Sequence, residues 1–170
     1  KFPVVIKPIN EGSSVDVYIC NKKNFLAKVK RLKYYGEILI EKYIPGREIQ
    51  AAVLGNKKLG AIELIPKRKF YDYKAKYNKN ANTQHIMPAN IPPKKYLEVN
   101  NIALKAHKIL KCSGVSRSDF RFFKNKFYLL ELNTQPGMTS LSLVPEIAKY
   151  NNIDFPNLLD QILRYAKNNK

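Results

Sequence analysis

The residues best suited to chemistry lie in one stretch, SRSDFRFFKNKFYLLELNTQPGMTSLS, at positions 116–142. Its aromatic and apolar residues predict two short strands joined by a tight turn at 125–126, which is a β-hairpin pattern. Asp119 begins the first strand, Glu131 ends the second, and Asn133 follows two residues later. The start of one hairpin strand lies beside the end of the other, and residues two apart share a face. We therefore expect these three side chains to converge on one spot.

Two carboxylates and an amide supply hard oxygen ligands of the kind that suit Mg²⁺. Because Mg²⁺ usually keeps several waters and shares substrate phosphates, this set indicates a nucleotide partner. The spacing alone leaves a plainer interpretation open, in which Asp119 caps a turn and Glu131 is an ordinary solvated strand end.

A second candidate site begins at Lys7, which follows an apolar strand and precedes the small polar loop EGSS at 11–14. Such a loop exposes backbone N–H groups and hydroxyls that can wrap phosphates, and a lysine can neutralise them. It is not a Walker A loop, because the Gly-Lys-Ser/Thr order is absent. Taken singly, Lys7 could be a surface lysine, Arg117 a structural ion pair and Tyr77 a packing aromatic.

The elements that must position these residues are short strands and helices, predicted from apolar alternation and from helical spacing. Residues 66–94 have no clear period and contain four prolines, so we expect a functional or mobile loop there. His107, on the second predicted helix, is expected at the surface or in a cap. The predicted strands cover 2–6, 15–19, 37–44, 48–54 and 58–65, and the predicted helices cover 21–33, 95–111, 143–149 and 155–167.

Length and composition suit one compact domain or two small lobes, since the chain has 170 residues of which 45% are hydrophobic. No stretch approaches the ~18 apolar residues that span a bilayer, so we expect no membrane partner. The start, KFPVVIKP, lacks an initiating Met and a signal segment, and is predicted to lie within a longer protein. Cys20 and Cys112 form no metal spacing or disulfide framework, which favours a reducing, cytoplasmic setting.

The charge is strongly basic, at +18 from 31 Lys and Arg against 13 Asp and Glu. Residues 22–33 alone carry six basic side chains and no acidic one. This pattern raises nucleic-acid binding as an alternative, but no helix-turn-helix, zinc or aromatic RNA-binding motif accompanies it. We therefore expect solvated lysine-rich surfaces and no nucleic-acid partner.

Five motifs occur in order along nearly the whole chain and together resemble the D-alanine–D-alanine ligase family. They are VVIKPINEGSSVDV (4–17), ILIEKYIPGREIQAAVLG (38–55), FYDYKAKY (70–77), SGVSRSDFRF (113–122) and LLELNTQPGMTSLSLVP (129–145). The second, fourth and fifth are similar to segments of many ATP-grasp enzymes. FYDYKAKY together with NTQPGMTSLSL points to the D-Ala–D-Ala branch.

The resemblance implies an α+β protein with the ATP-grasp fold, in which MgATP is held between two small α+β lobes. Residues 1–44 would be the remainder of the first lobe, and 45–170 would be the second lobe with a mobile loop at 66–94. The first lobe and the family's N-terminal domain would be incomplete in this chain, so we expect a C-terminal catalytic portion that is inactive alone.

The implied activity is an ATP-dependent ligation of two D-alanines for peptidoglycan synthesis in the cytoplasm. ATP would phosphorylate the carboxylate of one D-alanine, and the amine of the second would attack the acyl phosphate. The implied cofactors are ATP and Mg²⁺, with Mn²⁺ as a substitute and two ions in the site. The complete protein is expected to be a homodimer.

The resemblance also assigns residues to the nucleotide and the metal. Asp119, Glu131 and Asn133 would ligate Mg²⁺, while Lys7 and Lys76 would contact phosphates. Glu48 would accept from the ribose hydroxyls. The adenine would be framed by the backbone of Lys42, Tyr43 and Ile44, by Glu41, and by the apolar walls Phe70 and Leu130.

Five further residues are assigned to the amino-acid substrates. Arg117 and the backbone N–H of Gly137 would stabilise the tetrahedral oxyanion. Ser142 would hold the carboxylate of the second D-alanine, while Ser13 and Tyr77 would order the site of the first.

Lys74 departs from the family, which usually has Glu at that place in the aromatic loop, and this puts the contacts of the loop in doubt. One alternative function is another ATP-grasp carboxylate–amine ligase, such as a D-Ala–D-lactate or amino-acid ligase, although Tyr77 favours a dipeptide product. The other is a non-catalytic basic module that binds nucleotides or nucleic acid. The substitution Asp119→Asn distinguishes an enzyme from a basic module. A basic module would keep or improve its nucleotide binding, because the change removes a negative charge, whereas the enzyme would lose Mg²⁺-dependent nucleotide binding.

Overall fold

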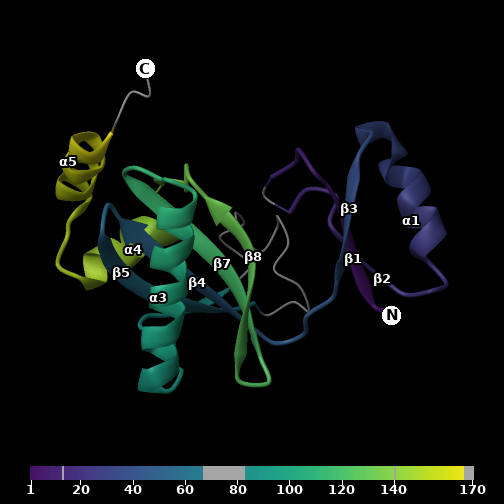
Figure 1. Cartoon of the computed structure of the whole chain (residues 1–170), viewed down its shortest axis with the longest axis horizontal. Coiled ribbons are helices and arrows are strands. Elements are labelled where there is room, and N and C mark those ends of the chain that lie inside the picture. The colour runs from purple at the N-terminus through teal and green to yellow at the C-terminus, as the bar shows by residue number, and fades with distance from the viewer. Residues whose placement is uncertain (13, 67–82, 140, 167–170) are drawn as a thin grey trace. The chain divides into compact units, whose positions relative to one another are not determined.

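The computed structural model describes residues 1–12, 14–66, 83–139 and 141–166 (Figure 1). Its described residues divide into two compact units. The first contains Lys1–Pro45, and the second contains Gly46–Ile65 together with the chain from Gln84 onward. Within the described residues, the structure has no helix with the length and apolar character needed to cross a membrane.

The first unit is a three-stranded antiparallel sheet in the order β2-β1-β3, with one helix packed on it. Phe25, Val29 and Leu32 recur at helical spacing and pack with Ile6 and Cys20 into a small core. The elements are β1 (Val4–Pro8), β2 (Tyr18–Cys20), α1 (Phe25–Leu32), the 3₁₀ turn η1 (Lys33–Tyr35) and β3 (Ile38–Lys42).

The second unit is a five-stranded antiparallel sheet in the order β6-β5-β4-β7-β8. The long helix α3 packs across the central strands, where Ile49, Phe120 and Val99 share one core (Figure 1). Its strands are β4 (Arg47–Leu54), β5 (Lys57–Ile65), β6 (Gln84–Ile86), β7 (Val115–Phe123) and β8 (Lys126–Asn133). Its helices are α3 (Pro93–Ile109), α4 (Leu143–Tyr150) and α5 (Phe155–Tyr165).

Two local predictions are wrong in this unit. The range 66–94 was expected to be loop, but β6 forms within it and α3 already begins at Pro93. The hairpin turns at Lys124 and Asn125, which both have positive φ (48° and 61°), as in a two-residue type I′ loop. The turn therefore lies one residue earlier than the expected position.

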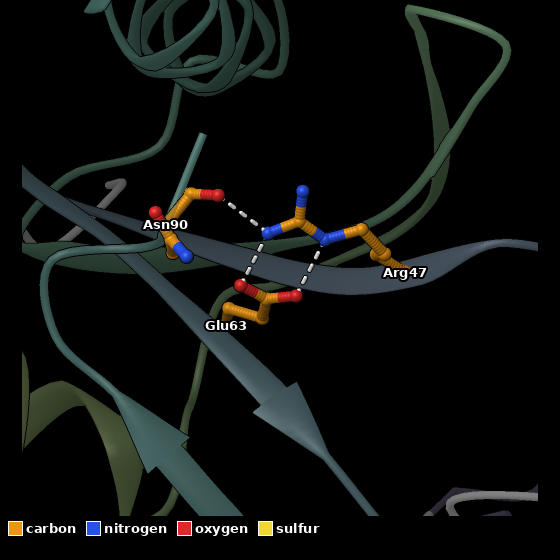
Figure 2. Close-up of polar contacts among 3 residues, drawn as sticks. All are labelled: Arg47, Glu63 and Asn90. Carbon is orange, nitrogen blue, oxygen red and sulfur yellow. Dashed lines mark hydrogen bonds and ion pairs between the residues drawn. The ribbon is translucent and has the colours of Figure 1, made fainter. Parts of the chain in front are cut away.

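An ion pair between exposed Arg47 and buried Glu63 fixes the sheet where β4 begins (Figure 2). Arg47 donates to both carboxylate oxygens of Glu63 on β5, at 2.6 and 2.5 Å, and its Nη2 also donates to the carbonyl of Asn90 at 2.6 Å. Glu63 is only 3% exposed. Arg47 thus joins two strands to the segment that precedes α3.

His107 lies inside the second unit, so the expectation of a surface position is wrong. It is 2% exposed because it continues the buried face of α3 that includes Val99 and Ala103. Its Nδ1 lies 2.7 Å from the hydroxyl of Ser116 on β7. Burial lowers the pKa of His107 from its usual 6.5, against the opposing effect of a backbone hydrogen bond at Cys112.

This histidine should make the second unit less stable in mild acid. The unfolded chain binds a proton near pH ~6.5 that the folded chain rejects, so the free energy of unfolding falls as the pH drops below that value. The slope for one proton is about 1.4 kcal/mol per pH unit. Urea unfolding at pH ~7.5 and ~5.5 should show a smaller pH difference in His107→Gln than in the unchanged protein. Equal differences in both proteins would contradict the assignment to His107.

Candidate functional site

The candidate site lies on one face of the five-stranded sheet. Side chains alternate along a strand, so Glu48 and Gln50 point away from Ile49, which packs in the core with α3. The β4–β7 register places Arg121 opposite Glu48 and Asp119 opposite Gln50. The β7–β8 register then places Asp119 opposite Glu131 and Arg117 opposite Asn133. Strand alternation and register therefore bring the predicted acidic, basic and amide residues to the same face.

Asp119 and Glu131 are direct cross-strand partners, so the two carboxylates that were expected to converge lie close together. Asn133 is near them, because its Nδ2 lies 3.4 Å from a carboxylate oxygen of Glu131. Leu130 is the extra residue of a β-bulge between the Asp119–Glu131 and Phe120–Leu129 pairs, and it is 39% exposed.

This arrangement fits a particular kind of metal ion. Among the described residues, no group of three or more His, Cys, Asp or Glu side chains could hold a metal. The available donors are two carboxylates and one amide oxygen. They suit an ion such as Mg²⁺, which takes much of its coordination shell from water and phosphates rather than from a protein cage.

Arg117 pairs with Asp119 through both guanidinium branches. Its Nε donates to one carboxylate oxygen at 2.8 Å and its Nη2 to the other at 3.0 Å. Their side chains are 15% and 7% exposed, respectively. Charge-assisted bidentate pairs fix both position and orientation, so Arg117 is held beside the carboxylate expected to bind metal.

Arg121 was not predicted as a site residue, yet it contacts one. Its Nη2 lies 3.2 Å from Oε2 of Glu48, and its Nη1 donates to the carbonyl of Gly46 at 3.1 Å. The available signal was its position two residues after Asp119 in a strand, which places it on the same face. Gln50 was also missed: it is 1% exposed on this face, and its Oε1 has no hydrogen-bond partner among the described residues.

The structure brings the predicted residues Gly137 and Ser142 together after β8. The Ser142 hydroxyl accepts a hydrogen bond from the Thr139 backbone N–H at 2.9 Å and lies 2.9 Å from the Thr139 hydroxyl. A Cβ added at Gly137 would lie 2.9 Å from Ser142 Oγ. Glycine therefore keeps the backbone close to this hydroxyl, which lies at the start of α4.

The described site residues of the first unit lie on β1, on β3 and in the two residues that follow β3. The Lys7 ammonium lies 2.8 Å from a carboxylate oxygen of Glu41, so these two side chains form an ion pair between β1 and β3. Tyr43 donates its backbone N–H to the Pro3 carbonyl at 3.3 Å. Lys42 is exposed, and both Tyr43 and Ile44 are partly buried.

Asp16, which the sequence analysis did not single out, lies just before β2 and contacts two tyrosines of the first unit. Its carboxylate accepts hydrogen bonds from the hydroxyls of Tyr18 and Tyr35, at 2.5 and 2.7 Å. These bonds lower the pKa of Asp16, and the same pairing raises the pKa of Tyr35 to about 12. Ionised Asp16 therefore links β2 to η1 through these two hydroxyls.

Five residues named in the sequence analysis lie outside the described residues. They are Ser13, Phe70, Lys74, Lys76 and Tyr77.

Comparison with known proteins gives consistent matches. A family model described as "D-ala D-ala ligase C-terminus" matches residues 1–164. The D-alanine–D-alanine ligase of Pelagibacter ubique is 62% identical over 170 residues, which cover all of this chain and 56% of that protein.

Solved structures give the same result. The D-alanine–D-alanine ligase of Bacillus anthracis matches with a TM-score of 0.83 and 36% identity, over 96% of this chain and 54% of that one. A structure of that enzyme complexed with ATP matches with a TM-score of 0.80 and 34% identity, over 96% and 53%. The chain thus spans about half the length of the relatives it matches.

Proposed function

The chain belongs to the D-alanine–D-alanine ligase family, and from that membership we propose that the complete protein joins two D-alanines at the expense of ATP. The observation that carries this proposal is the shared sheet face on which Asp119 meets Glu131 and Arg117. Phosphoryl transfer needs charge neutralisation and positioning rather than a protein nucleophile, and this face supplies both.

In the first proposed step, a carboxylate oxygen of one D-alanine attacks the γ-phosphorus of ATP, and ADP leaves. Asp119, Glu131 and Asn133 would hold Mg²⁺, which supplies neutralisation of phosphate charge when bound. Mn²⁺ could substitute, and the site would take two ions. Lys7 and Lys76 would contact the phosphates, and Glu48 the ribose. Glu41, Lys42, Tyr43, Ile44, Phe70 and Leu130 would surround the adenine.

In the second proposed step, the amine of another D-alanine attacks the acyl-phosphate carbon. The tetrahedral oxyanion is stabilised by Arg117 and by the backbone N–H of Gly137. Phosphate then leaves with the bonding electron pair, and the amine loses a proton. Ser142 would hold the carboxylate of the incoming D-alanine, while Ser13 and Tyr77 would order the first substrate.

The proposed setting is the cytoplasm, where the product would enter peptidoglycan synthesis, and the proposed assembly is a homodimer. The family match does not favour a different carboxylate–amine ligase or a non-catalytic basic module.

The test is nucleotide binding by the complete protein, followed as a thermal shift with ATP in the presence and absence of Mg²⁺. A ligand at 100 times its Kd stabilises the native state by about 2.7 kcal/mol, so a functional site should give a clear Mg²⁺-dependent shift. Glu131→Gln should abolish this shift. Glu98→Gln is the matched control, since Glu98 lies on α3 and pairs with Lys95. A shift that is equal in all three proteins and independent of metal would contradict the proposal.

A further inference from the structure

Arg121 contacts two points of the second unit, the Glu48 side chain and the Gly46 backbone. Its guanidinium contacts Oε2 of Glu48 at 3.2 Å and the carbonyl of Gly46 at 3.1 Å. The Arg121 and Glu48 side chains are 15% and 11% exposed, so water screens this ion pair only weakly. Both contacts come from the cross-strand neighbour of Glu48 in the β4–β7 register.

Gly46 gives the arginine a fixed point of attachment. It is the first residue of the second unit, and its φ of +135° is one that residues with a side chain rarely adopt. A Cβ at this position would lie 2.4 Å from the backbone oxygen of Phe122 and 3.0 Å from the Cβ of Phe123. The Gly46 backbone is therefore packed directly on β7, next to Arg121.

We propose that Arg121 is a positioning residue that holds Glu48 in the orientation needed to accept hydrogen bonds from the ribose of ATP. This inference rests on the proposed function, and it adds Arg121 to the residues that family resemblance assigned. A carboxylate offers about four acceptor sites, so its pair with Arg121 leaves capacity for a ligand. Restraining Glu48 in advance lowers the entropy lost when ATP binds.

An arginine suits this role because one planar guanidinium reaches both points: its Nη1 donates to the Gly46 carbonyl while its Nη2 forms the ion pair with Glu48 Oε2. A lysine keeps the charge but cannot reproduce the planar fork. Arg121→Lys should therefore preserve part of the effect, whereas Arg121→Met should remove it.

Arg47 provides a matched control on β4, the strand that also carries Glu48. It also pairs with a buried glutamate and donates to a backbone carbonyl (Figure 2), but on the opposite face of the sheet. Arg47→Met should lower stability, since it removes the partner of buried Glu63. It should not alter the preference of the protein for a nucleotide with ribose hydroxyls over one without them.

The experiment compares the Kd of ATP with that of 2′,3′-dideoxy-ATP, by calorimetry on the complete protein with Mg²⁺ and without amino acid. Hydrogen bonds to a charged acceptor should give the unchanged protein about a tenfold or larger preference for ATP. We expect Arg121→Met to lose most of this preference, Arg121→Lys to lose part of it, and Arg47→Met to keep it. Glu48→Gln should reduce the preference as well, and adding Arg121→Met to it should have little further effect.

The outcomes separate the two proposals. Full ribose preference in a folded Arg121→Met protein would overturn the role of Arg121 while leaving the ligase function in place. An unchanged protein that binds both nucleotides equally would overturn the role through Glu48. An unchanged protein that binds neither nucleotide would overturn the proposed function, and with it this inference.

Discussion

Asp119→Asn in the complete protein is expected to abolish Mg²⁺-dependent ATP binding and to lower ligase kcat/KM by about a thousandfold or more. The amide keeps the shape of the side chain but removes the anionic charge that a hard cation needs. Metal-based charge stabilisation is worth several kcal/mol, and each ~1.4 kcal/mol is a factor of ten in rate. Calorimetry with and without Mg²⁺, together with D-alanine-dependent phosphate release, measures both effects.

Asp160→Asn is the control for this change. Asp160 lies on α5 and forms an exposed pair with Arg164, of the kind worth ~0–1 kcal/mol, so binding and rate should stay unchanged. ATP binding by Asp119→Asn that is unchanged or tighter, and independent of metal, would instead identify a basic nucleotide-binding module.

Arg117→Met should lower kcat by about 10²–10³-fold while leaving Mg²⁺-dependent ATP binding in place. We expect kcat to fall without a loss of ATP binding because the guanidinium acts on charge that develops in the tetrahedral intermediate, after the nucleotide is bound. Its removal also takes a competing cation away from Asp119, so metal binding should not weaken. Arg117→Lys should recover part of the rate, because it restores the charge without the bidentate geometry.

Single-turnover kinetics measure the rate, and nucleotide calorimetry measures ATP binding, on the same Arg117→Met protein. If Arg117→Met lost ATP binding as completely as Asp119→Asn, Arg117 would belong to the nucleotide site and not to the oxyanion site.

The family and the α+β ATP-grasp fold were predictable from the sequence, because five motifs occur in one order, and matches over 96% of the chain confirm both. The hairpin pattern predicted that Asp119 and Glu131 lie near each other. Their direct pairing also depends on the β-bulge at Leu130, without which Asp119 would lie opposite Leu130, and the sequence pattern did not indicate that bulge. Their chemical roles remain predictions.

Other features required knowledge of contacts between distant segments. The pair between Arg121 and Glu48 depends on the register of β4 against β7, which no local pattern specifies. The burial of His107 depends on which face of α3 meets the sheet. The strand β6 has only three residues, too few for alternation to be detected.

Glu48 and the pair Gly137 and Ser142, which carry proposed contacts to the nucleotide and to the amino-acid substrates, lie on different kinds of backbone. Glu48 lies on β4, which is paired on both sides and buried at seven of its eight positions, so its amide hydrogens should be among the slowest to exchange. Gly137 lies outside any helix or strand, and Ser142 occupies the position just before α4, where its side chain makes no capping hydrogen bond. Irregular segments tolerate replacement better than central strands. Under the proposed roles, substitutions in this irregular segment should change which amino acid is accepted as the second substrate while leaving the Glu48 contact to ATP in place.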